Sequence, residues 1–159
     1  MTCRVKICGL MSADVVDASV EAGADMLGFV FFPPSPRSLS VADAAALTAR
    51  VPNQVKCVAL SVDADDRLLD AIAADAGVDM LQFHGQEPCE RVTEVRERYG
   101  LPVMKAVAIA GPKDVARAHA YADVADRLMF DAKPPKDATR PGGNALAFDW
   151  QLISDSSWT

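Results

Sequence analysis

The sequence has few of the residues that bind metals or form disulfides. It holds two histidines and four cysteines in 159 residues, and no two cysteines have C-x-x-C spacing. Scattered cysteines without that spacing disfavour both a zinc site and a disulfide framework. We therefore predict no metal site. The four cysteines are Cys3, Cys8, Cys57 and Cys89.

The sequence also lacks runs of basic residues and long apolar stretches. The net charge is −6, and binding nucleic acid would need clustered Lys and Arg to neutralise phosphates. No apolar stretch approaches the roughly 18 residues of a membrane-spanning helix, and the first residues lack a signal-peptide pattern. Half of the residues are hydrophobic, which is enough for a sizeable core. We predict a soluble, cytoplasmic protein that binds a small molecule and neither nucleic acid nor membrane.

Strand and helix signals alternate along the chain. At the start, the apolar pair Val5 and Ile7 leads through Cys8 into a glycine turn, and a helix signal follows at Ser12. This order places Cys8 at the carboxyl end of a strand, where parallel α/β proteins carry their chemistry. We predict further strands at 26–32, 56–60 and 103–107, one ending at His84 and one closing on Asp131. The predicted helices are 12–22, 40–49, 65–76, 87–98 and one opening at Pro112.

An internal repeat supports this alternation. The segment EAGADMLGF at residues 21–29 returns as DAGVDMLQF at 75–83, and a looser third copy lies at 122–130. A separation of about two strand–helix units indicates that the same unit recurs. Six strands in 159 residues fit either an open doubly wound sheet or a barrel that lacks its last quarter, because a closed (βα)₈ barrel has eight strands and typically about 250 residues.

Five motifs lie in order over essentially the whole chain: KICG at 6–9, ADMLGF at 24–29 leading into PSPR at 34–37, LQFHG at 81–85, LMFD at 128–131, and GG at 142–143 with FDW at 148–150. Together they resemble the phosphoribosylanthranilate isomerase family of tryptophan biosynthesis. The resemblance implies an α/β fold of the TIM (βα)₈-barrel family, with about six βα units in this chain, as a single incomplete barrel domain at 1–159.

The chain departs from the family pattern near its end. The family continues into two further strands that bind the substrate phosphate, and this sequence stops at Thr159 before them. The glycine loop reads Gly142-Gly143-Asn144, where the family usually has a further glycine. The expected phosphate contacts are backbone N–H groups of Gly142 and Gly143.

The reaction implied by the resemblance is an Amadori rearrangement, catalysed by one acid and one base without a cofactor. Asp131 matches the acid that protonates the furanose oxygen, and we expect burial or a nearby negative charge to raise its pKa above the usual value of about 3.9. Cys8 matches the base that removes the C2′ proton. A free thiol has a pKa of about 8.5, so a nearby cation is needed to favour the thiolate. We expect Lys6, on the same strand face, or Lys105 to supply it or to pair with Asp131.

The resemblance implies two further substrate contacts. Arg37 lies in a loop with three prolines, which removes backbone donors and stiffens the chain, and its guanidinium suits the carboxylate of an anthranilate ring. His84 follows a strand near the expected pocket, where a structural role and a substrate contact are equally compatible with the sequence.

Two alternatives stay open. The chain can be a catalytically silent barrel fragment that self-associates through open sheet edges into a homo-oligomer. It can also be another phosphosugar barrel enzyme, although those sites use lysines or metal and diphosphate groups. The pairing of Cys8 with Asp131 favours the isomerase.

Overall fold

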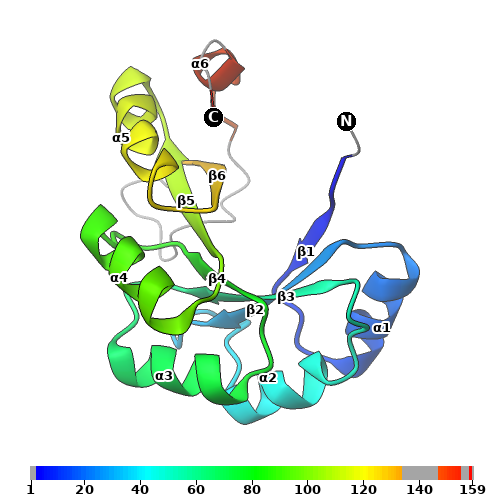
Figure 1. Ribbon diagram of the computed structural model, residues 1–159. Coiled ribbons are helices and arrows are strands. Elements are labelled where there is room, and N and C mark those ends of the chain that lie inside the picture. Colours follow the sequence, from blue (N-terminus) through cyan, green and yellow to red (C-terminus); the bar gives the residue numbers. More distant parts are fainter. Residues whose placement is uncertain (1–2, 134–146, 155–157, 159) are drawn as a thin grey trace. The chain divides into compact units, whose positions relative to one another are not determined.

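A computed structural model describes residues 3–133, 147–154 and 158 (Figure 1). By their contacts the residues form two compact units, Met1–Gln82 and Phe83–Thr159. In both units the described strands alternate with helices, as the sequence predicts. Each unit is described by itself.

The first unit carries a sheet in the order β1-β2-β3-β4. β1 pairs with β2 and β2 with β3, both in parallel, and helices α2 and α3 lie side by side (Figure 1). All six residues of β2 are buried, as in a strand that is covered on both faces. The elements are β1 (Lys6–Cys8), α1 (Ala13–Glu21), β2 (Met26–Phe31), α2 (Val41–Thr48), β3 (Lys56–Ser61), α3 (Asp66–Asp75) and β4 (Met80–Phe83), whose last residue opens the second unit.

The second unit carries the parallel pair β5 and β6, and α5 packs against both strands. Pro112 stands at the first turn of α5, where its missing N–H costs no hydrogen bond. The elements are α4 (Cys89–Tyr99), β5 (Val103–Ile109), α5 (Pro112–Ala122), β6 (Arg127–Ala132) and α6 (Gln151–Ser154).

Two predicted boundaries are wrong by two residues, and several others differ from the structure by one residue. β5 runs two residues beyond the predicted end at Val107, because its pairing with β6 continues to Ile109. Helix α4 begins at Cys89 and not at Glu87, since Pro88 takes the extended N-cap conformation. Glu87 therefore stands outside the helix, and its side chain is almost completely buried. No helix among the described residues is long and apolar enough to cross a membrane.

The internal repeat corresponds to a recurring contact at the entrance of the strands. Asp25, Asp79 and Asp126 occupy the same place in the three copies. Each carboxylate accepts a backbone N–H near the N-terminal end of the preceding strand: that of Val5 just before β1 at 2.7 Å, that of Cys57, the second residue of β3, at 2.8 Å, and that of Val103, the first residue of β5, at 2.8 Å. Each aspartate also donates its own N–H to the carbonyl of that same residue. The repeated aspartate thus satisfies two backbone groups at once.

Candidate active site

In the first unit, Cys8 and Lys6 converge over Gly28. Cys8 ends β1 and is paired in register with Gly28 of β2, and Lys6 lies two residues earlier on the same face. A Cβ placed on Gly28 would lie 2.6 Å from Cys8 Sγ and 2.9 Å from Lys6 Nζ. The missing side chain at Gly28 therefore leaves the space in which thiol and ammonium sit together. Of the two lysines expected from the sequence to lie near the thiol, Lys6 is the one that lies beside Cys8 in this unit.

Arg37 lies against the turn that follows Cys8. Its Nη1 donates to the carbonyl of Cys8 at 3.2 Å, and a Cβ on Gly9 would come within 2.7 and 2.8 Å of Arg37 Cδ and Cζ. Gly9 has φ +84°, a conformation that L side chains rarely adopt. Gly9 therefore lets the chain turn sharply and lets the guanidinium approach the backbone.

The loop that carries Arg37 is fastened by its serines as well as by proline. Ser35 Oγ accepts the N–H of Arg37 at 3.2 Å, and Ser38 Oγ accepts the N–H of Phe32 at 3.1 Å. Ser38 also forms a bridge with Val30 of β2. The loop is tied to the end of β2, and the exposed Arg37 is held beside Cys8.

In the second unit, His84 and Asp131 form a pair. His84 Nε2 lies 3.3 Å from Asp131 Oδ2, with the side chains 15% and 31% exposed. Asp131 Oδ1 also accepts the N–H of Ala132 at 2.8 Å. The hydrogen bond from His84 lowers the pKa of Asp131; burial opposes this shift, and the Ala132 N–H adds to it. The expectation that burial raises the pKa of Asp131 is wrong for this structure, because the contact with His84 outweighs desolvation.

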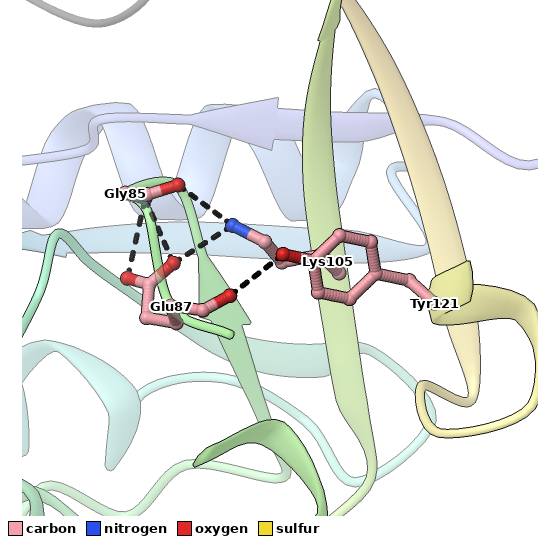
Figure 2. A network of polar contacts seen from close by, with 4 residues as sticks. All are labelled: Gly85, Glu87, Lys105 and Tyr121. Carbon is pink, nitrogen blue, oxygen red and sulfur yellow. Dashed lines mark hydrogen bonds and ion pairs between the residues drawn. The ribbon is translucent and has the colours of Figure 1, made fainter. Parts of the chain in front are cut away.

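Lys105 does not pair with Asp131, contrary to one of the two roles expected of it. Lys105 is in register with Leu128 of β6, three residues before Asp131, so the two side chains point to opposite faces of the β5–β6 pair. The ammonium instead lies 2.7 Å from Glu87 Oε2 and donates to the carbonyl of Gly85 at 2.8 Å (Figure 2). From the sequence alone, Glu87 is predicted only as the first residue of a helix, without a functional role.

The structure thus gathers the predicted site residues into two groups. Lys6, Cys8 and Arg37 lie together in the first unit, and His84 and Asp131 lie together in the second. Gly142 and Gly143 lie outside the described residues. No group of three or more potential metal-binding side chains occurs within the described part of the chain.

Comparison with known proteins decides the family. The model of the family "N-(5′-phosphoribosyl)anthranilate (PRA) isomerase" matches residues 5–158. The chain belongs to the PRA isomerase family. The PRA isomerase of Rhodopseudomonas palustris is 59% identical over 153 residues, which cover 96% of this chain and 72% of that protein. The PRA isomerase of Rhodospirillum rubrum is 55% identical over 157 residues, with the same two coverages.

Solved PRA isomerase structures share the fold. The enzyme from Thermotoga maritima superposes with a TM-score of 0.84 at 34% identity, over 96% of this chain and 70% of that one. A PRA isomerase in complex with reduced 1-(o-carboxyphenylamino)-1-deoxyribulose 5-phosphate gives 0.77 at 34% identity, over 82% and 66%. A third structure, of monomers generated from the dimeric Thermotoga maritima enzyme, gives 0.80 at 33% identity, over 96% and 69%. These matches confirm the predicted family, its TIM-barrel-type α/β fold class and the enzyme class, an isomerase.

Proposed function

We propose that this chain catalyses the Amadori rearrangement of N-(5′-phosphoribosyl)anthranilate to 1-(2-carboxyphenylamino)-1-deoxyribulose 5-phosphate, a step of tryptophan biosynthesis. Membership of the PRA isomerase family supports the reaction. The observation that carries the mechanism is the convergence of Cys8, Lys6 and Arg37 at the carboxyl end of β1, the end of a parallel strand at which barrel enzymes place their chemistry.

Cys8 acts as the general base. Once the ribose ring has opened to an iminium, the Cys8 thiolate removes the proton from C2′. The electron pair of that C–H bond forms the C1′=C2′ double bond, and the π pair of the C=N bond moves onto the nitrogen. The ammonium of Lys6, held with Cys8 over Gly28, stabilises the negative charge on sulfur before this transfer. The resulting enolamine then tautomerises to the aminoketone.

Asp131 acts as the general acid that protonates the furanose oxygen as the ring opens. In the substrate-free protein the contact with His84 lowers the pKa of Asp131 and favours the carboxylate. Bound substrate would shield the partly exposed carboxyl from water, and desolvation raises the pKa of a carboxylic acid. We assign to His84 the role of holding Asp131 in place and exchanging its proton.

Arg37 anchors the substrate through the carboxylate of the anthranilate ring. Its guanidinium is exposed and held beside Cys8, and a planar fork of N–H donors matches a carboxylate. The predicted phosphate contacts of Gly142 and Gly143 remain predictions. So do a cytoplasmic location and a homo-oligomer; the latter is supported by the dimeric Thermotoga maritima relative.

The proposal is tested by following the loss of PRA fluorescence with the purified protein and three variants. Cys8→Ala and Asp131→Asn should each lower kcat by about 10²- to 10⁴-fold, the usual contribution of a general acid or base. Arg37→Met should mainly raise KM, by about 10-fold or more, because a charge-assisted contact is lost. Cys3→Ala, which removes an exposed thiol, is the control and should keep wild-type kinetics. Wild-type protein without turnover, or Cys8→Ala with wild-type kcat, would refute the proposal.

A further inference from the structure

A buried ion pair lies on the face of β5 opposite to Asp131. Lys105 Nζ and Glu87 Oε2 are 2.7 Å apart, and their side chains are only 3% and 4% exposed (Figure 2). Removing two charges from water carries a large desolvation penalty, and apolar residues of similar volume often stabilise a protein as well or better. Stability alone therefore does not account for this pair.

Both charged groups bind the turn that follows β4. Glu87 accepts the N–H of Gly85 at 3.0 Å through Oε2 and 3.2 Å through Oε1, while Lys105 Nζ donates to the Gly85 carbonyl at 2.8 Å. Tyr121 of α5 donates its hydroxyl to the carbonyl of Glu87 at 2.8 Å. Its ring centroid also lies 5.5 Å from Lys105 Nζ, within range of a cation–π contact. Side chains of β5 and α5 thus fix this turn at both ends (Figure 2).

The residue directly before Gly85 is His84, the partner of Asp131. Lys105 and Asp131 point to opposite faces of the β5–β6 pair, so the ion pair acts on Asp131 only through the backbone of the turn. The backbone N–H and C=O of Gly85 are both held. This restricts the orientation of the peptide groups on both sides of Gly85, and with them the direction of the His84 side chain.

We propose that Lys105 and Glu87 are positioning residues that hold His84 in hydrogen-bonding contact with Asp131. Neither residue touches the reacting atoms. The catalytic effect of this positioning rests on the proposed function. The contact between His84 and Asp131 is present in the protein without substrate and can be tested independently of turnover.

The test replaces the ion pair by uncharged side chains of similar size. A single substitution would leave one buried charge unpaired and could unfold the protein, so the variant is Lys105→Met combined with Glu87→Gln. The amide oxygen introduced by Glu87→Gln can still accept the N–H of Gly85, whereas the thioether introduced by Lys105→Met cannot donate to the Gly85 carbonyl. The control is Val95→Ala, which removes wholly buried atoms from α4 and costs stability without removing a polar group of the turn.

The first readout is the titration of the Asp131 carboxyl by ¹³C NMR. In the wild type the contact with His84 lowers its pKa; in the double variant the titration midpoint should rise toward the ordinary value of about 3.9. In Val95→Ala it should stay as in the wild type. A double variant with an unchanged Asp131 titration would overturn the proposal, and it would assign the ion pair a structural role only.

The second readout is the split between kcat and KM. The double variant should lose about 10- to 100-fold in kcat with little change in KM, because a small displacement of a catalytic group slows the chemical step more than binding. Circular dichroism and thermal melting show whether the double variant is folded. Val95→Ala shows how much kcat falls when the protein is destabilised without a change to the turn. An equal loss of kcat in both variants would contradict a positioning role. The Asp131 titration needs no turnover, so an inactive wild type would refute the proposed function and leave the titration to decide this inference.

Discussion

At the scale of single residues, Gly28 determines whether Cys8 can sit where the proposed mechanism needs it. We expect Gly28→Ala to displace the thiol and the Lys6 ammonium, because its Cβ would overlap both, and to lower kcat by about 10- to 100-fold. The PRA fluorescence assay measures this. Gly111→Ala is the control, since nothing lies within 4 Å of its added Cβ, and it should keep wild-type kcat. Full activity of Gly28→Ala would argue against Cys8 as the base.

Gly9 combines two requirements in one residue. Its φ of +84° disfavours any side chain, and a Cβ would also overlap Arg37. Gly9→Ala should therefore raise KM and lower stability together. Gly100, the C-cap of α4, has φ +63° but open space around it, so Gly100→Ala should cost about 1 kcal/mol in the free energy of unfolding and leave KM unchanged. Urea unfolding and steady-state kinetics on both variants separate the two effects, and equal KM values would contradict the contact with Arg37.

Cys57 should behave as an inert core residue. Burial, with a smaller contribution from the Asp79 carboxylate, raises the pKa of its thiol to about 11 from 9.0. Because the folded state holds this proton more tightly than the unfolded one, stability should be intact below pH 9 and fall as the pH rises toward 11. Cys57→Ala should flatten that pH dependence in urea unfolding. A steeper or equal slope in the variant would contradict this assignment, as would rapid alkylation of Cys57 in the native protein at a pH of about 8.

At this scale the sequence correctly predicted positions that depend on one strand or loop. The position of Cys8 at a strand end, and that of Lys6 on the same face two residues earlier, follow from strand periodicity alone. The sequence did not predict contacts in which the second residue comes from a distant element. The pKa of Asp131 depends on His84, and the face that Lys105 occupies depends on the register of β5 against β6. No sequence pattern contains these two facts.

At the scale of elements, the repeated aspartates hold the N-terminal ends of strands in place through hydrogen bonds to the backbone. Asp79→Ala should lower the free energy of unfolding by about 1–3 kcal/mol, because the buried N–H of Cys57 loses its carboxylate acceptor. Lys56→Met is the matched control: it removes the exposed ion pair with Asp79 and leaves the bond to Cys57. It should cost less than about 1 kcal/mol. Urea unfolding measures both, and equal losses would mean that the ion pair, not the backbone contact, matters.

The order of the elements was predictable, because apolar runs, prolines and glycines mark strands and turns locally. The repeat predicted only that the same strand–helix unit recurs. The structure adds that the aspartate shared by the three copies makes the same backbone contact in each. Exact ends were less predictable. β5 is longer than expected because β6 offers pairing partners to its last residues, and α4 starts later because Pro88 adopts an extended conformation.

At the scale of the whole molecule, composition and periodicity alone left an open sheet and a barrel equally possible. The order of the five motifs pointed to the barrel, and the family match over residues 5–158 decided it. The predicted single domain at 1–159 stays a prediction. So does the union of the two groups, Cys8 with Lys6 and Arg37, and Asp131 with His84, in one reaction.

In the proposed mechanism, Cys8 removes the C2′ proton of phosphoribosylanthranilate and Asp131 supplies the acid. The most direct measurement is the single-turnover rate, with protein in excess, for substrate carrying hydrogen or deuterium at C2′. Single turnover separates chemistry from product release. We expect a primary isotope effect in the wild type and a rate at least about 10²-fold lower for both isotopes in Cys8→Ala. Equal rates for the two isotopes in the wild type, together with an unchanged rate in Cys8→Ala, would contradict this mechanism.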